Sequence, residues 1–204
     1  MKTTLELGPD VVQRLLPHRR PLLMVDRVEA YEDGPQPTLH AARMISANEP
    51  VFDGHFPGLS LWPGVYTIEG LLQASNILHI LWIARADVKT AGGDPEEVFA
   101  ALKNLELGYR LHPGYQPELT KKFAPLLGEN PDPVSRGGLA GAIDVKLLAP
   151  VFAGQRLEYR TTVSRVVDQL QRFEVEATVA GRTVAKGVLT SSRGALHMPA
   201  ARKE

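Results

Sequence analysis

One long apolar segment limits the folds open to this chain more than any other feature. From residue 65 to about residue 85 the sequence reads VYTIEGLLQASNILHILWIAR, with no glycine or proline after Gly70. Apolar residues fall on nearly every face of the helix that this pattern predicts, which is typical of a helix buried all round. Its most apolar run, residues 77–84, is far shorter than the roughly 20 residues that cross a bilayer. The sequence therefore predicts a central helix wrapped by other elements, and no membrane span.

Strand-forming runs elsewhere in the chain can supply that wrapping. Four lie late in the sequence, at residues 141–148, 156–167, 170–180 and 182–191. Turns are expected at residues 168–169 and 180–181, and such short connections favour antiparallel hairpins. Two further strands are expected at residues 22–31 and 38–46, after a short helix at residues 9–16 that Pro17 ends. The fold class is therefore α+β, with an antiparallel sheet curled around one helix.

The length of 204 residues favours one elaborated domain over two. We expect a single domain over residues 1–204. Residues 87–138 form an insertion, with a helix that Asp94 caps and Pro95 begins. Loop sequences follow this helix at residues 112–117 and 129–133. Residues 193–204 are expected to be a flexible tail.

Charge and cysteine content exclude several classes of function. Lysine plus arginine and aspartate plus glutamate both number 23, so the balance gives no reason to expect binding to nucleic acid. The chain has no cysteine, which excludes disulfides and thiolate metal sites and fits a reducing compartment. The first 21 residues lack the continuous apolar core of a secretory signal. We expect a cytoplasmic protein.

Glu69 is the only acidic residue of the apolar segment. A carboxylate in apolar surroundings costs free energy unless it is paired, neutralised or open to a cavity. The alternative is a glutamate in the first turn that favours the helix dipole and faces solvent. Helical spacing places Glu69 on the same side as Gln73. The apolar surroundings favour a functional acid.

His55 precedes this segment, in the loop sequence GHFPG of residues 54–58. A lone loop histidine is often a surface residue, but histidine is also the side chain best suited to moving a proton near neutral pH. Gly64, at the expected start of the helix, offers backbone N–H groups to a developing negative charge. Together, His55, Glu69 and these amides suit the removal of a proton next to a carbonyl.

Three motifs in this sequence resemble the β-hydroxyacyl-(acyl carrier protein) dehydratases of the FabZ type. LPHRRPLLMVDRV at residues 16–28 is similar to the family's LPHRYPFLLVDRV, and NEPVFDGHFPG at residues 48–58 to NEPFFQGHFPG. WPGV at residues 62–65, with Glu69 and Gln73 following, resembles FPGVLILEAMAQ. The likeness covers roughly residues 10–84 and resumes weakly at residues 141–144 and 150–151.

This resemblance implies a hot-dog fold, in which an antiparallel sheet wraps a long central helix. It also implies a homodimer, often assembled as a trimer of dimers, with active sites at the subunit interface. There His55 of one chain faces the partner's Glu69. The substrate is a 3-hydroxyacyl thioester on acyl carrier protein or coenzyme A, and no metal or organic cofactor is required.

The implied reaction eliminates water to give the trans-2-enoyl thioester. His55 is the base that takes the C2 proton, and Glu69, held partly protonated by its apolar setting, protonates the departing hydroxyl. The backbone N–H groups of Gly64 and Val65 polarise the thioester carbonyl. The residues expected to support this site are Phe56, Pro57, Gly58, Pro63 and Gln73.

The sequence departs from the family pattern at a few positions. Arg20 replaces an aromatic residue, Gly70 follows the glutamate where the family has alanine, and Gln155 replaces the aspartate of a late PGD. The insertion at residues 87–138 is longer than the family's usual connection and stands where the family often gates its acyl tunnel.

The remaining histidines and a basic cluster are not expected to take part in the reaction. His79 is expected to be a core histidine and His18 a structural one. His40 and His112 have no carboxylate at metal-ligand spacing, so no metal site is predicted. A basic cluster could meet an acidic carrier protein or be a solvated surface. Its members are Arg19, Arg20, Lys121 and Lys122.

Three alternatives to a dehydratase remain. A bifunctional dehydratase/isomerase of the related FabA type typically carries aspartate in place of Glu69. A hot-dog thioesterase does not have the His-Phe-Pro-Gly loop as its hallmark. A non-catalytic acyl-binding subunit would have no need of the His55 and Glu69 pair.

Overall fold

We analysed a computed structural model of the chain, which describes residues 1–117, 123–127, 139–167 and 170–192. The strands are β1 (Lys2–Leu7), β2 (Arg27–Glu32), β3 (Thr38–Met44), β4 (Leu139–Leu147), β5 (Arg156–Val167), β6 (Leu170–Val179) and β7 (Arg182–Ser192). The helices are α1 (Pro9–Leu15), the 3₁₀ helix η1 (Pro50–Asp53), α2 (Gly64–Thr90), α3 (Glu96–Leu111) and α4 (Ala124–Leu127).

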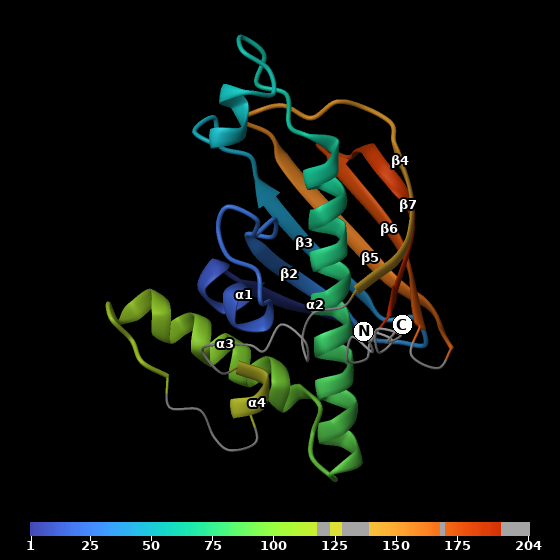
Figure 1. Cartoon of the computed structure of the whole chain (residues 1–204). Coiled ribbons are helices and arrows are strands. Elements are labelled where there is room, and N and C mark those ends of the chain that lie inside the picture. Colours follow the sequence, from blue (N-terminus) through green and yellow to red (C-terminus); the bar gives the residue numbers. More distant parts are fainter. Residues whose placement is uncertain (118–122, 128–138, 168–169, 193–204) are drawn as a thin grey trace, which may run out of the picture.

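The strands form one antiparallel sheet in the order β1-β2-β3-β5-β6-β7-β4. Helix α2 runs along one face of this sheet, as Figure 1 shows. The strand that follows the helices, β4, joins the sheet at the edge opposite β1. A long helix held by an antiparallel sheet confirms the expected hot-dog fold.

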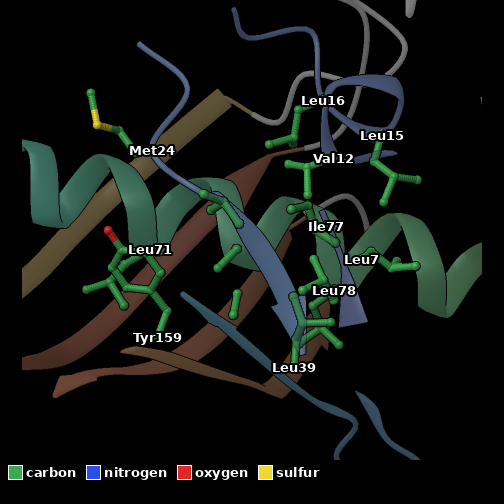
Figure 2. Packing of buried hydrophobic residues seen from close by; sticks show 14 of the residues in the cluster. Leu7, Val12, Leu15, Leu16, Met24, Leu39, Leu71, Ile77, Leu78 and Tyr159 are labelled. Carbon is green, nitrogen blue, oxygen red and sulfur yellow. The ribbon is translucent and has the colours of Figure 1, made fainter. Parts of the chain in front are cut away.

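The burial of α2 agrees with the sequence pattern. No residue from Tyr66 to Arg85 is exposed, and Leu71, Ile77 and Leu78 are fully buried in the core between α2 and the sheet. Figure 2 shows this packing, with the Tyr159 side chain directed from the sheet toward α2 beside Leu71. One stripe of the helix is only half-buried in the single chain. It consists of Ile68, Leu72, Asn76 and Ile83.

The strand expected at residues 22–31 was wrong in its first half, because β2 begins only at Arg27. The backbone of residues 22–24 is bonded to side chains, chiefly that of Gln73, instead of to a neighbouring strand. The Gln73 amide donates to the carbonyl oxygen of Leu22 at 2.7 Å and accepts from the backbone N–H of Met24 at 2.8 Å. These bonds satisfy backbone groups that would otherwise need a neighbouring strand.

Strand β1 was not predicted. Its side chains alternate, with Leu5 and Leu7 buried and Thr4 and Glu6 exposed, which is the pattern of a strand with one buried face. The other strands and the 180–181 turn agree with the sequence to within two residues at each end. The turn expected at residues 168–169 and the tail at 193–204 lie outside the described residues.

Helix α3 is fastened to the core through Arg85 of α2. The Arg85 guanidinium forms ion pairs with Glu96 at 2.8 Å and with Asp33 at 2.9 Å. It also lies 4.3 Å from the centre of the Phe99 ring, within the range of a cation–π contact. Asp94 accepts from the backbone N–H of Glu96 at 2.9 Å, although α3 begins one residue later than expected. The division into one domain with an insertion at 87–138 stays a prediction.

The contacts of α3 lie with α1, β1 and α2. Arg85, where α3 meets α2, is 16 residues beyond Glu69 (85 − 69), or about 24 Å along the helix axis. Helix α3 therefore meets α2 at the end remote from Glu69. None of the helices in the described ranges is long and apolar enough to cross a membrane.

Candidate functional site

A tight turn holds the loop that carries His55. Phe56 and Leu59 exchange backbone hydrogen bonds of 2.9 and 2.8 Å. Between them stand Pro57 and Gly58, whose φ of 81° is the left-handed value that a type II turn requires at its third residue. Pro57 suits the position before it because its φ is fixed near the required angle. The residues expected to support the site therefore define the shape of this loop.

The His55 ring is held in one tautomer. Its Nδ1 lies 2.9 Å from the carbonyl oxygen of Leu61, and a carbonyl oxygen only accepts. Nδ1 must therefore carry a proton, and in the neutral ring the lone pair is then on Nε2. The Phe56 ring stacks on the imidazole at a centroid distance of 4.3 Å. This arrangement prepares Nε2 to accept a proton.

The start of α2 lies in the same cavity as His55. This cavity of about 360 Å³ is lined by His55, Gly64, Thr67 and residues 147–151, among others. The carbonyl oxygen of Pro63 accepts from the N–H groups of Tyr66 at 3.0 Å and Thr67 at 3.4 Å. The N–H groups of Gly64 and Val65 precede these and cannot join the helical ladder. They are the donors that a helix N-terminus offers to an anion.

Glu69 is fixed by its neighbour one turn along α2. The Gln73 Nε2 donates to Glu69 Oε1 at 2.8 Å, as their helical spacing predicted. Gln73 is fully buried and is itself tied to the backbone at Leu22 and Met24. Of the two carboxyl oxygens of Glu69, this bond engages Oε1 alone.

His18 lies beside Glu69, a neighbour that the sequence interpretation missed. Its Nε2 is 3.5 Å from Glu69 Oε1, and both side chains are about three-quarters buried. Burial lowers the pKa of His18, the Glu69 carboxylate opposes this, and Arg19 adds to the lowering. His18 therefore lies within reach of the proposed acid, a contact that the sequence did not indicate.

Within one chain, the structure does not bring His55 and Glu69 together. Glu69 lines a second cavity, of about 200 Å³, with His18, Gln73 and residues of β4, β6 and β7. At about 3.6 residues per turn, the five positions from Gly64 to Glu69 (69 − 64) rotate the side chain by about 140°. The Glu69 side chain therefore projects from a different side of α2 from Gly64, which lines the His55 cavity.

Arg43 joins the three motifs and was not singled out in the sequence. Its guanidinium pairs with Asp26 at 2.7 Å and with Glu49. It also lies 5.7 Å from the centre of the Trp62 ring. Asp26, Glu49 and Trp62 come from the motifs at residues 16–28, 48–58 and 62–65. Arg43 thus ties the His55 loop and the start of α2 to the sheet.

Replacing Arg43 by methionine should lower the free energy of unfolding by about 1–2 kcal/mol. Breaking a fully buried pair costs about 3–5 kcal/mol, and the two carboxylates here keep some solvent contact. Arg156→Met is the control, because Arg156 pairs with Glu29 and Glu158 at the surface and should change stability by about 0–1 kcal/mol. Denaturant unfolding measures both. An equal loss in the two variants would contradict the proposed role of Arg43.

Apolar side chains are exposed around the His55 cavity and along β4. Apart from half-buried Val145, residues 140–148 are all exposed. The free edge of β4 has no strand partner among the described residues, and such an edge is a template for pairing with another chain. The exposed large apolar residues of this region are Phe56, Leu59, Val65, Ile143, Leu147, Leu148 and Phe152.

The other candidates behave as ordinary structural residues. His79 is buried in the core, as expected, and His40 pairs with Glu32 at 2.7 Å. The described ranges contain no group of three or more histidines or acids placed to hold a metal ion. A larger hollow of about 440 Å³ carries alternating charges of β4–β7, including Asp144, Lys146 and Lys186, and lies apart from the motifs. Lys121 and Lys122 fall outside the described residues.

Comparisons with known proteins agree with the motifs. The chain matches the FabA-like domain family over residues 16–113. It is 38% identical to the 3-hydroxyacyl-[acyl-carrier-protein] dehydratase FabZ of Aeromonas hydrophila over 120 residues, or 57% of this chain and 74% of the relative. FabZ of Nitratiruptor sp. is 38% identical over 103 residues, or 50% of this chain and 68% of the relative.

The fold also has a solved counterpart. The dehydratase heterocomplex ApeI:P from Xenorhabdus doucetiae contains a chain that matches with a TM-score of 0.52 and 17% identity, over 90% of both chains. This likeness concerns the fold alone. The sequence matches, in contrast, cover more than two thirds of the length of both FabZ relatives. On that identity and coverage, the chain belongs to the FabZ family of 3-hydroxyacyl-[acyl-carrier-protein] dehydratases.

Proposed function

We propose that this protein removes water from 3-hydroxyacyl thioesters to give trans-2-enoyl thioesters, in fatty acid or related acyl-chain biosynthesis. The observation that carries this proposal is the fixed tautomer of His55 in a cavity that also contains the start of α2. A base and a set of amide donors in one cavity suit the removal of a proton next to a carbonyl. Family membership supports the same reaction.

Each group has one task in the proposed mechanism. The amides of Gly64 and Val65 donate to the thioester carbonyl oxygen and so stabilise the charge that develops on it. His55 Nε2 takes the C2 proton, and the electron pair of that C–H bond forms the C2=C3 double bond. The C3–O bond breaks as Glu69 Oε2 gives its proton to the hydroxyl, which leaves as water. Exchange with solvent then returns a proton to Glu69 and removes one from His55.

We further propose that the two residues meet across a homodimer. Two observations support this arrangement. The carboxyl group of Glu69 faces a different cavity from His55 within one chain, and the residues around His55 and along β4 form an exposed apolar surface. Apolar surface of this kind marks protein interfaces. The partner's Glu69 would then complete the cavity of His55.

The remaining parts of the proposal concern partners and location. The family name supports an acyl-carrier-protein thioester as substrate, with a coenzyme A thioester as the alternative. A cytoplasmic location rests on the lack of cysteine and on this type of substrate. Assembly of dimers into a trimer of dimers is a further expectation of the resemblance.

Turnover with defined substrates tests this function. The purified protein is incubated with 3-hydroxyacyl thioesters on acyl carrier protein and on coenzyme A, and the products are separated by mass spectrometry and chromatography. The expected result is loss of one water and a 2-enoyl product alone. A 3-enoyl product would point to a bifunctional isomerase, and binding without turnover would point to a non-catalytic subunit.

A further inference from the structure

His18 lies in the short loop after α1, and the backbone of this loop is held in place by Arg19. The Nη1 atom of Arg19 donates to the carbonyl oxygens of Leu16 at 2.9 Å and of His18 at 2.8 Å. These bonds fix the loop on both sides of Pro17. The His18 ring is thereby placed against α2, where its Nε2 lies 3.5 Å from Glu69 Oε1 and both residues line the same cavity.

The surroundings of the His18 ring favour one tautomer. Its Nδ1 is buried and has no hydrogen-bond partner in the described part of the chain. A proton on Nδ1 would therefore be a buried donor without an acceptor, which is costly. Nε2 would also turn a lone pair toward Glu69 Oε1, an oxygen that accepts from Gln73. The proton is therefore placed on Nε2, whereas in His55 it is placed on Nδ1.

The His18 ring is neutral near neutral pH. Burial lowers its pKa below the ordinary value, the Glu69 carboxylate opposes this, and Arg19 adds to the lowering. The neutral state suits the neighbour of a proposed acid, because an imidazolium beside Glu69 would favour the carboxylate, which has no proton to give. A neutral ring can still donate a hydrogen bond through Nε2.

Two nitrogen donors are thus directed at one oxygen of Glu69. The Gln73 Nε2 lies 2.8 Å from Oε1 and the His18 Nε2 lies 3.5 Å from it. The longer distance exceeds the usual range of about 2.7–3.2 Å for such bonds. Hydrogen bonds at catalytic groups often shorten only in the reacting complex, and bonds to an ionised acceptor are shorter and stronger than bonds to a neutral one.

We propose, on the basis of the proposed dehydratase function, that His18 is a positioning residue for Glu69. Together with Gln73 it occupies Oε1, so that the proton of the acid is carried by Oε2. When Oε2 gives this proton to the departing hydroxyl, the Nε2–H of His18 shortens its bond to Oε1 and stabilises the carboxylate that forms. In this role His18 does not touch the reacting atoms and acts only through Glu69.

A change of leaving group tests this role. A 3-hydroxyacyl thioester is compared with the 3-chloroacyl thioester of the same length. In both, His55 takes the C2 proton and the electron pair of that bond forms the double bond, but chloride leaves as an anion and needs no proton from Glu69. His18→Leu should lower kcat for the hydroxyl substrate roughly 10–100-fold, the effect of one hydrogen bond to a charged group. KM and the enzymatic turnover of the chloro substrate, measured above its uncatalysed rate, should stay near the wild-type values.

Two further variants are the controls. His40→Leu removes another histidine that contacts a glutamate, Glu32, at 2.7 Å outside the site, and should leave both rates unchanged. His18→Gln keeps a neutral N–H donor near the position of Nε2 and should restore most of the activity on the hydroxyl substrate. Because the ratio of the two rates is measured on one preparation, partial unfolding of a variant does not alter it.

The wild-type protein offers an independent measurement. Nitrogen NMR of the protein labelled with ¹⁵N-histidine, at mildly alkaline pH, should show His18 protonated at Nε2 and His55 protonated at Nδ1. The signals are assigned from their loss in His18→Gln and His55→Ala. This measurement needs no turnover and still decides the question if His18→Leu does not fold.

The possible failures are distinct. Three results overturn the role of His18 and leave the dehydratase function standing: a proton on its Nδ1, an unchanged rate of His18→Leu on the hydroxyl substrate, or an equal loss on both substrates. Failure of the wild-type protein to turn over any 3-hydroxyacyl thioester overturns the proposed function, and the role of His18 with it.

Discussion

His55→Ala should lower kcat for dehydration by roughly 10²–10⁴-fold, the usual contribution of a positioned general base. The fixed Nδ1 proton leaves Nε2 as the nitrogen that accepts the C2 proton, and alanine offers no replacement. KM should change little, because the amides of Gly64 and Val65 still bind the thioester carbonyl. Steady-state kinetics on the thioester that the wild-type protein turns over best measures both quantities.

Glu69→Gln should produce a loss of the same order. Glutamine keeps the shape of the side chain and a hydrogen-bonding oxygen for Gln73, but it cannot give a proton to the departing hydroxyl. His112→Ala is the control, since His112 is exposed beyond α3 and should leave kcat unchanged. Wild-type rates in either site variant would contradict the assigned roles.

Gly70→Ala should lower the free energy of unfolding by about 3 kcal/mol, the upper end of the usual cost of overpacking a core. A Cβ atom at Gly70 would overlap the hydroxyl oxygen and Cζ of Tyr159. Gly70 is buried on α2, and Tyr159 lies in the core, where Figure 2 shows it. The greater helix propensity of alanine, up to about 1 kcal/mol, offsets only part of this. Thermal and denaturant unfolding measure the change.

Rescue variants distinguish this overlap from a general loss of stability. Tyr159→Leu should restore part of the loss in the Gly70→Ala background, because it removes the ring. Tyr159→Phe should not, since Cζ also overlaps the new methyl group. Gly54→Ala is the control, because a Cβ there has no atom within 4 Å. Full stability of Gly70→Ala alone would contradict the proposed packing.

Local patterns predicted much of the fold. The length and apolar character of residues 65–85 indicated the central helix, and the late strand runs lay within two residues of β4–β7. Residues 22–26 were misassigned because a run of apolar residues also suits a buried loop. The Gln73 amide bonds to the backbone of that loop at Leu22 and Met24. Residues 22–26 alone cannot indicate a hydrogen-bond partner about 50 positions away in the sequence.

In the candidate site too, local patterns indicated some residues, whereas others are brought there only by tertiary packing. His55, Glu69 and Gln73 could be predicted because each lies in a short motif or at a helical spacing. His18 and Arg43 could not, since their contacts depend on tertiary packing. His18 meets Glu69 across 51 positions (69 − 18), and Arg43 pairs with acids from two separate motifs. The clash of an alanine at Gly70 with Tyr159 gives a physical reason for glycine where the family has alanine.

The central claim is that one active site uses His55 from one chain and the partner's Glu69. Co-expression of His55→Ala and Glu69→Gln chains with different tags allows the mixed dimer to be purified. One of its two sites then contains both wild-type residues and the other contains neither. If the site is shared between chains, the mixed dimer should have about half of the wild-type activity, whereas each parent variant remains inactive. A mixed dimer as inactive as its parents would contradict a site shared between chains.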